Sequence, residues 1–270
     1  MIINPAFEAY YRGIYKNRWE GLRQGLLEPG AGILYGDGLR SPYYLDRASV
    51  LAALSLRLPP DMAEAAGKEE EPPLILDACA APGGKALIIA SRMGSGAVLV
   101  ANELSARRRR RLALVLDGHL PPEKRGTVKV SGFDAAAEAG RKGGRERFAA
   151  VLLDAPCSSE RHVIRDQRAL GAWTAARPKF LAHRQWALLS AAFLLLRPGG
   201  SLVYATCALS PDENDGVVRR LMEKYGGPGG SCTLDRLDFT EGEETAYGRI
   251  ILPDLSGGAG PLYTARFRKS

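Results

Sequence analysis

Short apolar runs alternate along the chain with segments of helical spacing, beginning at residue 74. The apolar runs cover residues 74–79, 97–103, 128–133, 148–154 and 201–207. The segments of helical spacing cover residues 84–93, 105–116, 179–196 and 212–225. Continuous apolar runs are typical of strands buried on both faces of a parallel sheet, and such strands need crossover connections, usually helices. The pattern predicts an α/β, doubly wound fold.

The two ends of the chain depart from this pattern. Residues 249–252 and 262–267 flank a glycine-rich turn, which predicts a C-terminal antiparallel hairpin on an otherwise parallel sheet. Near the start, the aromatic and apolar residues from Phe7 to Leu22 have near-helical spacing. A second helix is expected over residues 46–58, which end before two prolines.

A polar stretch at residues 68–73 is the best candidate for a domain boundary. We therefore expect an N-terminal helical or irregular extension over residues 1–72. The doubly wound domain is expected over residues 73–270.

Composition excludes several classes of protein. Apolar residues make up 46% and charged residues 25%, as in globular rather than disordered or fibrous proteins. No apolar run approaches the roughly 18 residues of a membrane helix, and the first residues do not resemble a secretion signal. The four cysteines form no C-x-x-C pair, so neither a metal site nor a disulfide framework is expected. Free thiols and a cytoplasmic location are predicted.

The net charge of +7 is concentrated in two segments. Residues 104–147 hold 12 Lys and Arg against 5 Asp and Glu, and residues 161–184 hold 6 against 1. The second segment also contains Trp173 and Phe180. Cations that meet phosphates and rings that stack on bases indicate a nucleic-acid partner. A solvated basic surface is the alternative interpretation.

A glycine turn follows the first strand of the predicted sheet. The sequence from Leu76 to Lys85 leaves the strand and enters a helix, at the edge where doubly wound folds bind nucleotides. It matches neither the dinucleotide nor the P-loop pattern. Glu103 and Asp134 end the next two strands, where they could meet a ribose and an adenine. Together these features favour an adenosine ligand without a pyrophosphate, and S-adenosylmethionine fits.

Two further strands end close to cysteines. Cys157 follows Asp154-Ala155-Pro156, and Cys207 follows Thr206, so both thiols are expected at the same edge of the sheet. Inert buried thiols are the alternative, because free cysteine packs like a small hydrophobic residue. A thiolate can add to C6 of cytosine and make C5 nucleophilic enough to take a methyl group. Asp154 is the nearest acid to hydrogen-bond N3 of the base.

From about residue 41 onward the chain resembles the RNA cytosine-C5 methyltransferases of the RsmB/Nop/Sun type. The motifs that carry the resemblance are DACAAPGGK at 77–85, ANELSARRRRRL at 101–112, DAPCS at 154–158 and PGGSLVYATCALSPDENDGVV at 198–218. Residues 43–49 and 157–162 are most similar to the short mitochondrial rRNA and tRNA members, which lack a PUA domain. The resemblance implies a Rossmann-like class I S-adenosylmethionine-dependent methyltransferase with a seven-stranded, mostly parallel sheet.

The resemblance also implies residue roles. Cys207 would be the nucleophile at C6, Cys157 would assist product release, and Asp154 would lie between cofactor and base. The residues expected to bind the cofactor are Ala80, Ala81, Pro82, Gly83, Gly84, Lys85, Glu103, Arg108, Asp134 and Asp154.

Three positions depart from the family pattern. Glu103 stands in place of the usual Asp, Ala86 in place of a common Thr, and Ser159 in place of the Gly of larger members. None of these departures replaces either of the two cysteines. The residues therefore still predict an RNA 5-methylcytosine methyltransferase (EC 2.1.1.-).

The expected partner is RNA, with rRNA favoured and tRNA possible, contacted through residues 161–184 and the N-terminal extension. A protein partner or a ribosomal subunit could supply further RNA affinity. One alternative is a catalytically idle RNA-binding or ribosome-assembly factor on the same fold. A DNA cytosine-C5 methyltransferase is less favoured, because Ser158 follows Cys157 where those enzymes have Gln.

Overall fold

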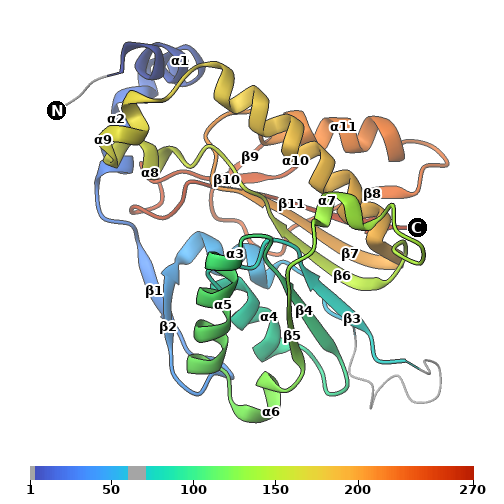
Figure 1. Cartoon of the computed structure of the whole chain (residues 1–270). Helices are drawn as coiled ribbons and strands as arrows, with labels where there is room; N and C mark the ends of the chain where they lie inside the picture. The colour runs from blue at the N-terminus through green and yellow to red at the C-terminus, as the bar shows by residue number, and fades with distance from the viewer. Residues whose placement is uncertain (1–3, 60–70) are drawn as a thin grey trace.

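The computed structural model describes residues 4–59 and 71–270 (Figure 1). The longer helices are α1 (Pro5–Tyr15), α2 (Trp19–Leu27), α3 (Arg47–Leu54), α4 (Gly84–Arg92), α5 (Ala106–His119), α10 (Ala176–Leu195) and α11 (Asp215–Tyr225). The shorter ones are η1 (Lys16–Arg18), α6 (Pro122–Arg125), α7 (Ala135–Glu138), α8 (Glu160–Arg165) and α9 (Gln167–Gly171). In this part of the chain, none of the helices has both the length and the hydropathy needed to cross a membrane.

One large mixed sheet forms the centre of the fold. Its parallel strands are β3 (Leu74–Asp77), β4 (Val98–Asn102), β5 (Val128–Ser131), β6 (Phe148–Asp154) and β7 (Leu196–Thr206). Its antiparallel strands are β8 (Cys232–Asp235), β9 (Glu243–Glu244), β10 (Arg249–Ile251) and β11 (Leu262–Lys269). The order is β5-β4-β3-β6-β7-β11-β10-β9, with β8 paired to β11.

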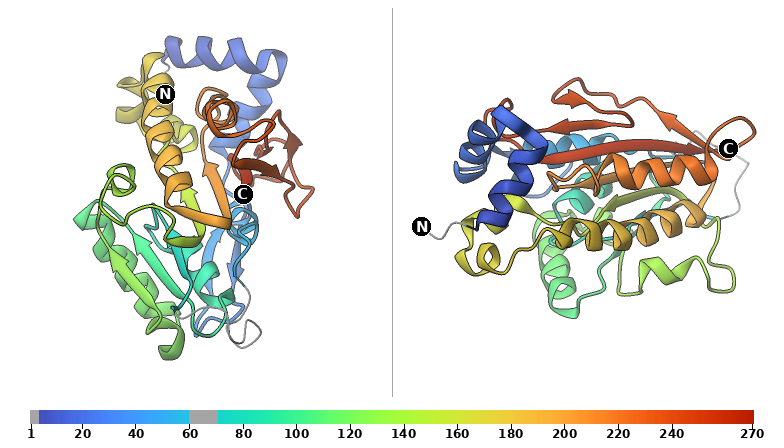
Figure 2. Two further views of the ribbon diagram at one scale, coloured as in Figure 1. Left: turned by 90° about the vertical axis from the view of Figure 1, so that its right-hand side faces the viewer. Right: turned by 90° about the horizontal axis from the view of Figure 1, so that it is seen from above.

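Helices cover both faces of this sheet (Figures 1 and 2). On one side α10 and α11 pack together, and α7 contacts α10; on the other, α4 packs against α3 and α5. The apolar strands serve both sides because successive side chains point in opposite directions. Leu76 packs in the cluster that includes α10 and α11, whereas its neighbour Ile75 packs in the cluster that includes α4 and α5.

The doubly wound prediction and the C-terminal hairpin are confirmed. The expected number of seven strands is wrong, because the described residues form nine in this sheet. The short strands β8 and β9 extend its antiparallel part. The first half of the expected boundary, residues 68–70, lies outside the described residues, so the division at 72 stays a prediction.

The N-terminal segment packs on the sheet's helical layer. Its helical spacing is interrupted at Lys16, where φ is +53°, so the expected helix is divided into α1, η1 and α2. Phe7, Tyr11 and Trp19 are fully buried and belong to the same hydrophobic cluster as α10 and β7. Residues 32–35 (β1) and 43–46 (β2) then form a separate two-stranded antiparallel sheet.

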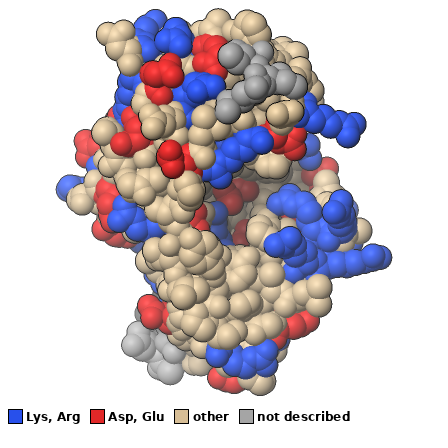
Figure 3. Space-filling model, turned by 90° about the vertical axis from the view of Figure 1, so that its left-hand side faces the viewer, with Lys and Arg blue, Asp and Glu red and all other residues tan. Residues whose placement is uncertain are grey.

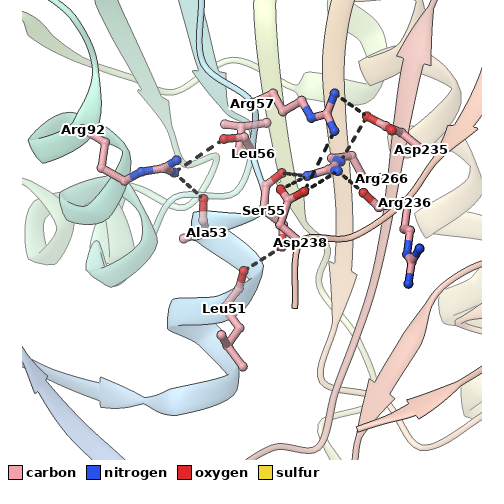
Figure 4. Close-up of polar contacts among 10 residues, drawn as sticks. All are labelled: Leu51, Ala53, Ser55, Leu56, Arg57, Arg92, Asp235, Arg236, Asp238 and Arg266. Carbon is pink, nitrogen blue, oxygen red and sulfur yellow. Dashed lines mark hydrogen bonds and ion pairs between the residues drawn. The ribbon is translucent and has the colours of Figure 1, made fainter. Parts of the chain in front are cut away.

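Helix α3 ends at Leu54, although the sequence pattern continues to residue 58. Arginine side chains donate hydrogen bonds to the backbone carbonyl groups at its C-terminal end (Figure 4). Arg266, fully buried on β11, donates to the Ser55 carbonyl at 2.9 Å, and Arg92 donates to Ala53 at 3.3 Å. Asp238 and Asp235 balance the charge of Arg266. These contacts attach α3 to the last strand, and cations suit the C-terminal end of a helix.

Candidate active site

The glycine turn connects β3 to α4 at the carboxyl edge of the sheet. Gly83 has φ +128°, and a β-carbon there would lie only 2.8 Å from a methyl carbon of Val115, so the position requires glycine. No side chain of the described residues caps α4. Its first N–H groups therefore lack a side-chain acceptor, and such groups at a helix N-terminus suit a carboxylate.

A cavity of about 580 Å³ lies beside this turn, at the ends of β3, β4 and β5. Glu103 lines it and is only 4% exposed. One carboxylate oxygen of Glu103 accepts the Ser105 N–H at 2.9 Å. The other forms a 3.1 Å ion pair with Arg108 but accepts no hydrogen bond within the described part of the chain. This buried acceptor matches the hydroxyl groups of a ribose, so the residues fit an adenosine-bearing ligand.

Asp134 lines the same cavity from the loop that follows β5. Its carboxylate accepts the Ala136 N–H at 3.0 Å and caps the short helix α7. The motifs in the sequence indicate no role for Asn102, at the end of β4. Its side-chain amide donates to the carbonyls of Ala78 and Phe133, each at 3.1 Å. Asn102 therefore ties together the three loops that form the cavity, a role that its position alone did not reveal.

Lys85 and Asp154 form an ion pair in a second cavity of about 240 Å³, which shares Cys79 with the first. The Lys85 ammonium donates to Asp154 at 2.8 Å and to the Ser49 hydroxyl at 3.1 Å. Burial lowers the pKa of Lys85, but the charge and hydrogen bond of Asp154, together with the charges of Asp77 and Cys207, raise it overall, so the ammonium form is held. Beneath them, burial and the charge of Asp154 raise the pKa of Asp77 to about 7.

The two cysteines predicted to share this edge are in contact. Cys157, after β6, and Cys207, after β7, have sulfur atoms 2.8 Å apart. The hydrogen bond to Cys207 and burial hold the pKa of Cys157 well above its ordinary value. Either sulfur can be the donor of this contact, and the raised pKa keeps Cys157 in the thiol form. The hydroxyl of Ser159 lies 3.3 Å from the Cys207 sulfur.

A third cavity, of about 430 Å³, opens at Cys207 and contains Asp154 and Lys85. Arg161 and Arg165 line it, but much of their hydrogen-bonding capacity is used by the protein itself. Arg161 donates to the carbonyls of Gly25 and Gly258, and Arg165 donates to that of Leu26. Figure 3 shows a hollow across the face on the left-hand side of Figure 1, with basic side chains along its sides and acidic ones within it.

Trp173 is not available to stack on a base, contrary to the interpretation of residues 161–184 as a contact surface for RNA. The indole is 3% exposed and packs against Phe7, with ring centroids 5.2 Å apart. Tyr10 and Tyr11 contact it as well. The burial arises from α1, a segment more than 150 residues away in sequence, so local spacing could not reveal it. Phe180, in contrast, is 69% exposed.

Comparisons with known proteins identify the family of this chain. Residues 65–268 match the family model of the 16S rRNA methyltransferases RsmB/F. Ribosomal RNA small subunit methyltransferase F of Enterobacter sp. is 42% identical over 209 residues, which cover 75% of this chain and 41% of that protein. The Aeromonas salmonicida protein of the same name is 36% identical, covering 84% of this chain and 45% of its own length. The chain thus spans less than half the length of these curated relatives.

Solved structures agree with this assignment. NSun6 from Pyrococcus horikoshii, solved with SFG, has a TM-score of 0.64 and 25% identity, covering 87% of this chain and 54% of that one. A methyltransferase homologue from Pyrococcus horikoshii has a TM-score of 0.72 and 20% identity, covering 98% of this chain and 94% of its own. The latter likeness shows the shared fold. Because the family model matches most of the length of this chain, the chain belongs to the RsmB/F family of 16S rRNA methyltransferases.

Proposed function

We propose that this protein is an S-adenosylmethionine-dependent RNA (cytosine-C5) methyltransferase that acts on small-subunit rRNA. The observation that carries the proposal is the Cys157–Cys207 pair, 2.8 Å apart, beside the Lys85–Asp154 ion pair. Membership of the family supports the rRNA substrate. Three expectations from the sequence remain predictions. They are a cytoplasmic location, a tRNA substrate in place of rRNA, and a likeness to the short mitochondrial members of the family.

The cavities at the strand ends support a cofactor-binding role for the predicted residues. Glu103, with Arg108 beside it, would hold the ribose, and Asp134 would face the adenine. The turn Ala80-Ala81-Pro82-Gly83-Gly84-Lys85 would hold the methionine part, with Asp154 at its far end. When bound, S-adenosylmethionine supplies a methyl group on a positively charged sulfur.

The chemistry begins at Cys207. Its thiolate forms a bond to C6 of the cytosine, and the electron pair displaced from the C5–C6 double bond gives C5 its nucleophilic character. Asp154 and the ammonium of Lys85, 2.8 Å apart, lie where they can hydrogen-bond the base during this addition. C5 then takes the methyl group and loses its proton to solvent water, and the electron pair of that C–H bond re-forms the C5–C6 double bond as the C6–S bond breaks to restore the Cys207 thiolate. Cys157, as a protonated thiol, is suited to donate to that leaving sulfur.

The test uses methyl-labelled S-adenosylmethionine and unmodified small-subunit rRNA, with Cys207→Ala and Cys157→Ala variants. We expect the wild-type protein to form labelled 5-methylcytosine and Cys207→Ala to be inactive. Cys157→Ala should accumulate a covalent protein–RNA adduct on a denaturing gel. The reverse pattern in the two variants would exchange their roles and favour a mechanism like that of DNA enzymes. Cofactor binding without any transfer would favour an idle assembly factor.

For RNA contact, the exposed basic and aromatic side chains within residues 161–184 are candidates, and Arg168 and Phe180 are two of them. The N-terminal extension contributes Asp46 and Ser49 to the cavity at Cys207, which supports its proposed RNA-facing role. We expect Arg168→Glu to weaken RNA binding and reduce its salt dependence, since each lost phosphate contact lowers the slope by about 1. Unchanged binding across a salt titration would contradict this placement. A protein partner or the ribosomal subunit itself would supply further affinity.

A further inference from the structure

Two consecutive residues, Glu213 and Asn214, lie directly behind the cysteine pair. They follow β7 and precede α11, and they are 0% and 4% exposed. The spacing of motifs in the sequence indicates no role for either residue. Burying a carboxylate and an amide costs free energy unless their polar atoms are paired, so the partners of these two side chains show what they do.

Asn214 forms hydrogen bonds with the residues on both sides of Cys207. Its side-chain oxygen accepts the hydroxyl hydrogen of Thr206 at 2.5 Å, and its side-chain nitrogen donates to the carbonyl of Ala208 at 3.0 Å. The Thr206 hydroxyl oxygen in turn accepts the Ala208 N–H at 3.3 Å. The backbone that carries Cys207 is thereby held before and after the thiol.

Glu213 supports the residues on both sides of Cys157, one of them directly and the other through Gln185. Its carboxylate accepts the N–H of Ser158 at 2.9 Å and also accepts the Ser158 hydroxyl hydrogen. The side-chain amide of Gln185 donates to Glu213 at 2.8 Å and to the carbonyl of Pro156 at 3.0 Å. Glu213 therefore holds Ser158 directly and Pro156 through Gln185.

The loops that carry the two cysteines follow different strands. Two consecutive residues, Glu213 and Asn214, nevertheless provide the hydrogen bonds that support both loops. We propose that the Glu213–Asn214 dipeptide is the positioning unit of the active site, with Asn214 orienting Cys207 for attack and Glu213 orienting Cys157 for release. This inference rests on the roles proposed above for the two thiols. Neither residue touches the reacting atoms, so both are positioning residues.

A separate contact ties the same loops together from the other side. Glu160, at the start of α8 and fully buried, accepts the Leu209 N–H at 2.9 Å and the hydroxyl of Tyr11. Because this contact shares no hydrogen bond with the dipeptide, the loops stay joined when Glu213 or Asn214 loses one hydrogen bond. Variants that remove a single contact should therefore fold.

The test compares two pairs of variants with unmodified small-subunit rRNA and S-adenosylmethionine. Asn214→Ala and Thr206→Val weaken the support of Cys207. Glu213→Gln and Ser158→Ala weaken the support of Cys157, and Thr206→Val and Ser158→Ala each remove only one hydroxyl. Glu223→Gln is the matched control, because its side chain lies on α11 and is 66% exposed. The readouts are kcat, KM for RNA, the covalent adduct on a denaturing gel, and cofactor affinity by calorimetry.

We expect the Asn214 and Thr206 variants to lose both methyl transfer and adduct, with kcat lowered by up to about 100-fold, as displacement of a reacting group can cost. The Glu213 and Ser158 variants should instead accumulate adduct while kcat falls. For Asn214→Ala and Thr206→Val, cofactor affinity should stay within about twofold, since the loop after β7 lines neither of the two cavities proposed for the cofactor. If both pairs lose activity in the same way, or keep wild-type rates, the inference is overturned.

The Cys207→Ala and Cys157→Ala variants are assayed in the same experiment. They distinguish a failure of this inference from a failure of the proposed function. If Cys207→Ala and Cys157→Ala do not differ in adduct formation, the proposed roles of the thiols fail. If they differ as expected while the two pairs of support variants do not, only the positioning role fails. Should Glu213→Gln or Asn214→Ala be insoluble, the two hydroxyl variants decide the result.

Discussion

Replacing Trp173 by alanine tests whether the N-terminal helices are part of the central fold. The indole is 3% exposed, and the rings of Phe7, Tyr10 and Tyr11 lie 5.2, 5.5 and 5.8 Å from it between centroids. Truncating a buried tryptophan costs about 3–5 kcal/mol in transfer and cavity free energy. The indole N–H has no hydrogen-bond acceptor among the described residues, and its removal recovers part of that cost. We expect a net loss of about 3 kcal/mol.

The assay is equilibrium unfolding in urea, followed by circular dichroism so that the lost fluorophore does not affect the signal. Phe180→Ala is the matched control, because Phe180 belongs to the same basic segment but is 69% exposed. It should change the free energy of unfolding by no more than about 0.5 kcal/mol. A loss below about 1 kcal/mol for Trp173→Ala would refute the packing argument. So would a separate early transition, which would show that α1 and α2 unfold on their own.

Three further predictions concern the site. Ser159 has φ +56°, a left-handed value that disfavours a side chain, so Ser159→Gly should raise the free energy of unfolding by up to about 1 kcal/mol. The same change should slow methyl transfer, because it removes the hydroxyl 3.3 Å from the Cys207 sulfur; an active variant at wild-type rate contradicts this role. Glu103→Ala should weaken S-adenosylmethionine binding by about 1.5–3 kcal/mol, the value of a hydrogen bond to a charged group; calorimetry measures it, and an unchanged affinity places the ribose elsewhere. Burial, with the charge of Glu160, raises the pKa of Glu213 from 4.5 to about 7, so the folded protein holds a proton there that the unfolded chain has released. Stability should therefore fall as pH rises from about 4.5 to 7, by on the order of 3 kcal/mol. Glu213→Gln should remove that part of the slope in urea unfolding at pH 5 and 7.5, and an unaltered slope would contradict the buried carboxylate.

The sequence by itself determined which segments form the parallel strands of the central sheet. It also determined which chemical groups follow those strands at the carboxyl edge. The apolar runs that became β3 to β7 and the turn at Gly83 are local signals, because strand burial and a positive φ depend on neighbouring residues. Parallel strands end at one edge, so the common location of Cys157 and Cys207 also followed from the pattern.

Only the tertiary structure decided how these parts are held. The burial of Trp173 depends on a helix from the opposite end of the chain, and the end of α3 depends on Arg266 of the last strand. Glu213 supports Cys157 through Ser158, 55 residues away, whereas Asn214 supports Cys207 through Thr206 and Ala208 of its own loop. The contacts of Trp173, Arg266 and Glu213 join residues far apart in sequence. Periodicity and motif spacing describe near neighbours and do not show which side chains form hydrogen bonds, so the support of the two cysteines is visible only in the folded structure.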